Sequence, residues 1–207
     1  MKNYKKNLEL LSKNYVYSKE MEHDACGVGV IVSTEGKKSR EIVEHGIEAL
    51  KAVWHRGAVD ADGKTGDGAG IHVEIPKDFF IEKIEVTGHD YDNAEICVGM
   101  IFLPRNDYSA QESCKTIVES ELTKNNFSIY GWRQVPVNPK ILGQKALQTM
   151  PEIIQVLFKS NDQSLLDKNL ERKIYETRKR IENKAFQLSL NNFYVCSISS
   201  KSIIYEG

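Results

Sequence analysis

Residues 25–32 read Ala25-Cys26-Gly27-Val28-Gly29-Val30-Ile31-Val32, and this stretch decides how the rest of the chain is interpreted. The residues before it, 1–25, carry five lysines, four acids and few clustered apolar side chains, which predicts a leader. From Cys26 onward the composition changes to β-branched residues interrupted by glycine, a pattern typical of a buried strand over 27–32. A cysteine therefore stands where a predicted leader meets a predicted strand.

Two interpretations of Cys26 follow from this position. One is a small buried hydrophobic side chain, which is the commoner fate of a cysteine. The other is an N-terminal nucleophile that is exposed by removal of residues 1–25. In that chemistry the thiol attacks and the free α-amine, with a pKa of about 8, acts as the base. The leader would keep such a nucleophile inactive, because a nitrogen inside a peptide bond cannot take up the proton.

Two further candidates follow in the chain. A helix is predicted over 39–55, and Arg56 just beyond its end is, on the residues alone, typical of a helix-dipole partner or a surface ion pair. The glycine-rich segment 63–70 contains Gly-Lys-Thr, but a phosphate-binding Walker A loop needs glycine at position 58, where Ala58 stands. We therefore reject a phosphate loop and expect a flexible turn, whose glycines let the backbone pass close to another group.

The remaining periodicities predict an α+β fold, because several strands are adjacent in sequence. Strands are expected at 71–75, 94–103, 127–135 and 152–159, helices at 78–83, 109–124, 144–149 and 164–188, and a β-hairpin at 193–199 and 202–205. Ser39 is the expected N-cap of the 39–55 helix. The charged run 168–184 is expected to be a solvated helix face, with Ile174, Ile181 and Leu188 on the packed side.

Composition excludes several classes of function. Basic residues number 28 and acidic residues 29, so no overall basic field favours nucleic acid or an acidic membrane surface. The longest apolar runs are too short to span a bilayer. No metal site is expected, because the four cysteines are widely spaced and no histidine has a partner at ligand spacing. Cys97, Cys114 and Cys196 are expected to be structural, and the cytoplasm is the expected compartment.

Taken together, the motifs resemble the glutaminase domain at the start of the glutamate synthase large subunit, a class II glutamine amidotransferase. The resemblance rests on Ala25-Cys26-Gly27-Val28-Gly29, His55-Arg56-Gly57-Ala58 and Ala61-Asp62-Gly63-Lys64-Thr65-Gly66-Asp67-Gly68-Ala69-Gly70. It continues in Val98-Gly99-Met100-Ile101-Phe102-Leu103-Pro104, Gly131-Trp132-Arg133-Gln134-Val135-Pro136 and Phe193-Tyr194-Val195-Cys196-Ser197. It covers nearly all of residues 22–207.

This resemblance implies an N-terminal-nucleophile fold, an αββα sandwich of two packed antiparallel sheets. It implies a leader, residues 1–25, that is cut off between Ala25 and Cys26. The thiol of Cys26 would attack the side-chain amide of glutamine and release ammonia, and the γ-glutamyl thioester would hydrolyse to glutamate. Arg56 matches the arginine that positions the nucleophile, and a cation beside a thiol favours the thiolate.

The resemblance also implies a larger enzyme in which the ammonia aminates 2-oxoglutarate. FMN and an iron–sulfur cluster are expected in other parts of that enzyme and no cofactor in this segment. The implied partners are the glutamine substrate, the remainder of the large subunit and a small subunit. The electron donor, NADPH, NADH or ferredoxin, is left open, because all three kinds of enzyme share this domain.

One departure from the family pattern limits the functional prediction. In the family, the segment that binds the glutamine carboxylate and the Asn-Gly pair of the oxyanion hole follow the hairpin predicted at 193–205. This sequence contains no Asn-Gly pair, so the substrate-binding residues are expected beyond Gly207 and the sandwich is expected to be incomplete on its C-terminal side. Since one oxyanion-hole donor is worth ~10²–10³ in rate, residues 26–207 alone, the first part of the domain, are expected to be inactive. The alternative is a non-catalytic binding or regulatory half-domain that acts with a second chain.

Overall fold

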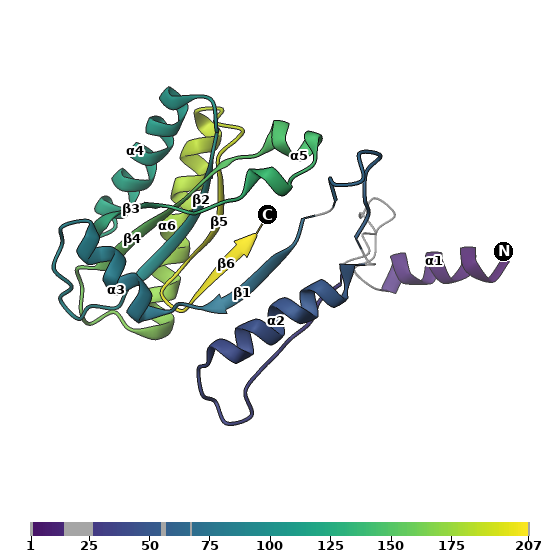
Figure 1. Ribbon diagram of the computed structural model, residues 1–207, viewed down its shortest axis with the longest axis horizontal. Helices are drawn as coiled ribbons and strands as arrows, with labels where there is room; N and C mark the ends of the chain where they lie inside the picture. The colour runs from purple at the N-terminus through teal and green to yellow at the C-terminus, as the bar shows by residue number, and fades with distance from the viewer. Residues whose placement is uncertain (1, 15–26, 55–56, 67, 207) are drawn as a thin grey trace.

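The computed structural model of the chain describes residues 2–14, 27–54, 57–66 and 68–206. Its centre is a four-stranded antiparallel sheet (Figure 1). The strand order is β3 (Phe127–Gln134), β4 (Glu152–Ser160), β2 (Cys97–Leu103) and β5 (Tyr194–Ser199). β2 is buried along almost its whole length, which explains its nearly continuous apolar sequence. The strand predicted at 94–103 is therefore confirmed as a central one.

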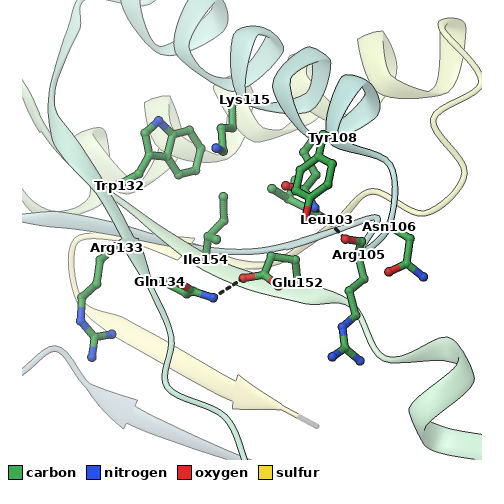
Figure 2. A pocket seen from close by; sticks show the side chains of 11 residues that line it. Leu103, Arg105, Asn106, Tyr108, Lys115, Trp132, Arg133, Gln134, Glu152 and Ile154 are labelled. Carbon is green, nitrogen blue, oxygen red and sulfur yellow. Dashed lines mark hydrogen bonds between the residues drawn. The ribbon is translucent and has the colours of Figure 1, made fainter. Parts of the chain in front are cut away.

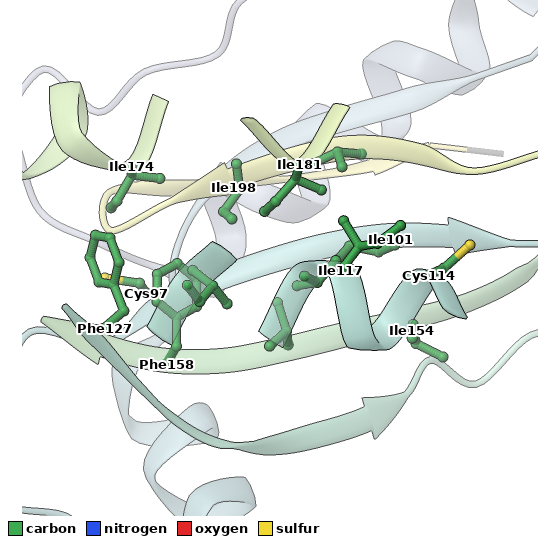
Figure 3. Close-up of a cluster of buried hydrophobic side chains, with 14 of the residues drawn as sticks. Cys97, Ile101, Cys114, Ile117, Phe127, Ile154, Phe158, Ile174, Ile181 and Ile198 are labelled. Atoms are coloured by element: carbon green, nitrogen blue, oxygen red, sulfur yellow. The ribbon is translucent and has the colours of Figure 1, made fainter. Parts of the chain in front are cut away.

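Two long helices cover one face of this sheet, α4 (Tyr108–Lys124) and α6 (Asp167–Gln187) (Figure 1). The N-terminus of α4 is capped by Asp107, whose carboxylate accepts a hydrogen bond from Ala110 N at 2.9 Å. Ile174 and Ile181 point from α6 into the core beneath the helices, as predicted (Figure 3). Leu188 was placed wrongly, because α6 ends at Gln187 and the Leu188 side chain is 63% exposed. The apolar spacing that predicts the helix continues past Gln187, although the helix itself ends there.

A second antiparallel sheet lies over the other face and consists of β1 (Gly70–Glu74) and β6 (Ser202–Glu206). The two sheets share a second core with α3 (Lys77–Val86), formed by the buried residues Ile75, Phe80, Ile84, Ile96, Val98, Met100, Tyr130, Leu157, Cys196 and Ile203. A helix layer thus covers one sheet, and a second sheet packs against the opposite face of the first. The two antiparallel sheets confirm the predicted α+β class.

The remaining described elements lie around these layers. α2 (Arg40–Ala52) packs beside β1, and its predicted cap is confirmed by a 3.3 Å hydrogen bond from Ile42 N to Ser39 Oγ. The 3₁₀ helix η2 (Pro139–Ile141) and α5 (Gln144–Thr149) connect β3 to β4, and α1 (Lys2–Asn14) lies within the predicted leader. No helix in the described part of the chain is long and apolar enough to cross a membrane.

The strand predicted at 27–32 is not formed. The described residues from Gly27 to Val32 pair with no strand, and the side chains of Val28 and Val30 are 88% and 80% exposed. A strand is defined by hydrogen bonds to a neighbour, and no strand among the described residues lies beside this segment to supply them. The β-branched sequence indicated a local preference, which does not by itself provide a partner.

The hairpin predicted at 193–205 is also wrong, although both of its strands exist. β5 pairs with β2 in the large sheet, whereas β6 pairs with β1 in the small one. The chain therefore crosses from one sheet to the other between Ser199 and Ser202. Cys196 on β5 and Ile203 on β6 are both buried in the core between the sheets, so the two strands face each other as layers.

Candidate functional site

The two residues to which the sequence analysis assigned catalysis, Cys26 and Arg56, lie outside the described residues. What the structure describes is the chain that flanks them. Gly27 follows Cys26 directly, and the turn that begins at Gly57 follows Arg56. Gly57 N donates a 3.1 Å hydrogen bond to the carbonyl oxygen of Trp54. The helix before it, α2, ends at Ala52, three residues before the end at His55 that the sequence analysis predicted.

The segment 59–66 is an ordered turn. Val59 and Gly66 form an isolated antiparallel bridge, and Asp60 N donates to Thr65 O at 2.7 Å. Gly63 lies at the tip with φ of +67°, a conformation that favours glycine. The expected turn between the helix and the strand is therefore formed over 59–66, and backbone hydrogen bonds tie it together across its base.

The carboxylate of Asp62 fills the inside of this turn. It accepts hydrogen bonds from Lys64 N at 2.9 Å, Thr65 N at 2.7 Å and Thr65 Oγ1 at 2.5 Å. These hydrogen bonds hold the pKa of the Asp62 carboxyl well below its usual range. A phosphate loop presents its backbone N–H groups to an anion, and here a protein carboxylate already takes them. The geometry supports the rejection of a Walker A loop.

The other cysteines are unsuited to nucleophilic chemistry. Cys97 and Cys114 are fully buried and Cys196 is 4% exposed, as expected for core residues. Burial raises the pKa of the Cys114 thiol to about 11. Burial, together with a hydrogen bond to Glu206, raises the pKa of Cys196 to about 12, and burial raises the pKa of Cys97 well above its usual range. None of these three supplies a useful amount of thiolate near pH 7.

A surface cavity of about 460 Å³ was not anticipated from the sequence (Figure 2). It lies between the start of α4 and the ends of β2, β3 and β4 that meet there. Its polar side chains are partly paired within the chain: Gln134 Nε2 donates to Glu152 Oε1 at 2.6 Å, and Trp132 Nε1 donates to Glu119 Oε1 at 2.7 Å. The lining contains neither a thiol nor a histidine, so the cavity does not offer the nucleophilic chemistry that the sequence suggests.

Metal binding gains no support from His72 and His89. His72 Nε2 lies 2.6 Å from Ser202 Oγ, and His89 Nδ1 lies 3.2 Å from Thr87 Oγ1, so both rings have hydroxyl partners. Within residues 2–14, 27–54, 57–66 and 68–206, no group of three or more His, Cys, Asp or Glu side chains could hold a metal ion. An iron–sulfur cluster, which needs about four ligands from the protein, finds no such set in this part of the chain.

The two antiparallel sheets, packed face to face under a layer of helices, are consistent with the N-terminal-nucleophile hydrolase architecture. Comparison with protein families makes the assignment specific. The family of class-II glutamine amidotransferases matches residues 26–207, and the chain belongs to that family.

Three relatives of the chain are named as glutamate synthases. The chain is 50% identical to the glutamate synthase [NADPH] large chain of Azospirillum brasilense, over 99% of its own length and 13% of that protein. It is 39% identical to ferredoxin-dependent glutamate synthase 1 of Arabidopsis thaliana, which is chloroplastic/mitochondrial, over 90% of its length and 12% of that protein. It is 36% identical to the chloroplastic ferredoxin-dependent enzyme of Spinacia oleracea, with the same coverage of both chains. The chain thus spans about an eighth of the length of these relatives.

Proposed function

We propose that this chain is part of the glutaminase unit of a glutamate synthase, and that Cys26, freed as the N-terminal residue, is its nucleophile. The observation that carries the proposal is the start of the family match at residue 26, the position at which the sequence analysis expects the leader to be cut. The burial of the other three cysteines supports the choice of Cys26.

The proposed reaction proceeds through a thioester. The α-amine of Cys26 takes the thiol proton, and the thiolate attacks the side-chain amide carbon of glutamine. The carbon–nitrogen bond breaks, and ammonia leaves with the proton that the α-ammonium group returns. Water then attacks the thioester while the amine accepts its proton, and glutamate leaves as the thiol is restored. Arg56 positions the thiol and favours its thiolate form through its positive charge.

The role of the product is the one that the resemblance to glutamate synthases implies. In a glutamate synthase, the ammonia released here would aminate 2-oxoglutarate, with FMN and an iron–sulfur cluster supplied by other parts of the enzyme. The remainder of the large chain and a small subunit are the proposed partners, glutamine is the proposed substrate, and the cytoplasm is the proposed compartment. Residues 1–25 are the proposed leader, and 26–207 the proposed first part of the amidotransferase domain, with little turnover of its own.

The experiment is to express the full-length polypeptide that the gene encodes, and to measure its intact mass and its glutaminase activity. We expect a mature N-terminus at Cys26, and a loss of glutamine hydrolysis by at least ~10³-fold in Cys26→Ser. Cys114→Ala is the matched control, because Cys114 is buried on α4 and has no place in the reaction.

A mature N-terminus elsewhere, or a Cys26→Ser variant as active as Cys114→Ala, would refute the proposed nucleophile. The non-catalytic half-domain would then be the better description. A separate assay on residues 1–207 tests the expected inactivity of this part alone. Turnover there that disappears in Cys26→Ser would correct that expectation and support the nucleophile.

A further inference from the structure

The turn at 59–66 is joined by hydrogen bonds to the start of α5, which lies about 80 residues later in the sequence. Gln144 N, at the start of α5, donates a 3.1 Å hydrogen bond to Asp62 Oδ2. Lys145 Nζ lies 2.5 Å from Asp60 Oδ2. The turn is therefore fixed from outside itself, by the chain that connects β3 to β4.

Gly143 makes this contact possible. A Cβ atom at this position would lie 2.1 Å from Thr65 Oγ1 and 2.5 Å from both Thr65 N and Asp62 Oδ2. The φ of Gly143 is −71°, which any residue adopts, so the requirement for glycine here is one of space and not of backbone conformation. Because one of the conflicting atoms is a backbone nitrogen, a larger residue would have to push the two segments apart.

Asp62 serves the turn and the junction with different oxygen atoms. Oδ1 accepts the hydrogen bonds from the backbone N–H groups of Lys64 and Thr65, within the turn. Oδ2 accepts from Thr65 Oγ1 and from Gln144 N, the latter across the junction. An asparagine could keep the acceptor Oδ1, and its NH₂ could donate to the Thr65 hydroxyl, but that NH₂ offers Gln144 N–H no acceptor. Asp62→Asn is therefore a substitution that spares the turn and removes the Gln144 hydrogen bond across the junction, while the Lys145–Asp60 ion pair remains.

We propose that Asp62 and Gly143 are positioning residues for glutamine hydrolysis, because they anchor the 59–66 turn on the start of α5 and so fix the chain that leaves Arg56. This inference rests on the proposed function, in which Arg56 orients the nucleophile. Val59 is only three residues beyond Arg56, a reach of at most ~11 Å. Displacing the turn therefore displaces the backbone next to Arg56, and an error of about 1 Å in such a site costs up to ~10²-fold in rate.

The test uses the full-length polypeptide with Asp62→Asn and Gly143→Ala, and measures both amide hydrogen exchange and glutaminase kinetics. Asp162→Asn is the matched control for the first variant, because the partly exposed Asp162 also accepts hydrogen bonds from a backbone N–H and a hydroxyl two residues ahead, in Ser164. Gly46→Ala is the control for the second, because a Cβ there would meet Ile71 Cδ1 at an ordinary 3.4 Å.

In Asp62→Asn we expect faster exchange at Gln144 N–H, with protection retained at Lys64 and Thr65. We expect kcat for glutamine hydrolysis to fall by about tenfold or more, with KM within about twofold, because the residues that bind glutamine are expected beyond Gly207 and not at the junction. Gly143→Ala should speed exchange at the amides of Lys64, Thr65 and Gln144, and should lower kcat more than Asp62→Asn does. Both control variants should keep the kcat of the unaltered enzyme.

Unchanged exchange at Gln144 in Asp62→Asn would overturn the junction itself. Faster exchange with an unaltered kcat, in an enzyme that Cys26→Ser still inactivates, would overturn the positioning role and leave the proposed function intact. Retained activity in Cys26→Ser would refute the proposed function, and the positioning role with it. The exchange data would still report whether the junction exists.

Discussion

The crossing from β5 to β6 depends on one carboxylate of α6, and its removal gives a quantitative prediction. Glu171 Oε1 accepts hydrogen bonds from Ser200 N and Ser200 Oγ, both at 2.7 Å, and Oε2 accepts from Ser199 Oγ at 2.9 Å. Ser200 is only 2% exposed, so its groups cannot turn to water when the carboxylate is gone. Glu171→Ala should therefore leave a buried N–H and a buried hydroxyl unsatisfied.

An unsatisfied buried donor costs about 1–3 kcal/mol, and each lost side-chain hydrogen bond about 1 kcal/mol. Since Glu171 is itself partly exposed, we expect a loss of about 3 kcal/mol in the free energy of unfolding. Glu171→Gln should cost only about 1 kcal/mol, because it keeps Oε1 as the acceptor for both Ser200 groups. It loses only the hydrogen bond from Ser199 Oγ, which already accepts from Lys201 N and Ser202 N and cannot accept a third. The matched control is Glu176→Ala on the same helix, which removes an exposed pair with Arg172 worth about 0.5 kcal/mol.

Equilibrium urea unfolding at pH 7, followed by circular dichroism, measures these differences. With an m-value of about 2 kcal/mol/M, the midpoint for Glu171→Ala should shift by about 1.5 M and that for Glu176→Ala by about 0.25 M. Losses within about 0.5 kcal/mol of each other for these two variants would refute the reasoning. In that case the crossing would be held by the packing of the two sheets alone.

Three further outcomes are expected. Gly99→Ala should destabilise the chain by about 1–3 kcal/mol in the same assay, because its Cβ would lie 2.7 Å from Val156 Cγ1. The double variant with Val156→Ala should lose less free energy of unfolding than the sum of the two single changes, because the smaller residue removes this clash. Asp92, whose pKa is lowered to about 2 by hydrogen bonds from Lys159 and Tyr130, should stabilise the chain fully above its ordinary pKa of 3.8. That contribution should vanish as the pH falls towards 2, so Asp92→Asn should flatten the melting temperature across this window; an equally steep acid profile in the variant would contradict this assignment. Finally, iodoacetamide at pH 7.5 should leave the three buried cysteines unmodified until urea unfolds the chain. If peptide mapping finds one of them alkylated in the native protein, the burial of that cysteine is incomplete.

Most individual elements could be predicted from sequence, because their signals are local. The helix expected at 109–124 is observed at Tyr108–Lys124, and the strand expected at 152–159 at Glu152–Ser160. Their apolar spacing, and polar caps such as Ser39, lie within a few residues of the structure that they determine. Leu188 marks the limit of this reasoning, because periodicity does not show at which residue a helix ends.

Strand pairing could not be predicted, because it joins distant segments. The sequences of β5 and β6 predicted two strands and a short turn, and these features do not distinguish a hairpin from a crossing between sheets. Glu171, far from the turn in sequence, holds the crossing. The 27–32 segment shows the same limit, since its residues favour a strand but no strand among the described residues pairs with it.

By itself, the sequence determined the family of this chain, its candidate nucleophile and most of its helices and strands, because motifs and periodicities are properties of adjacent residues. The tertiary structure confirmed that the other three thiols are buried, as the sequence led us to expect. It alone decided that β5 and β6 belong to different sheets and that Gly143 must be small. Strand pairing and close approach depend on atoms brought together from distant parts of the chain, and no local pattern records them.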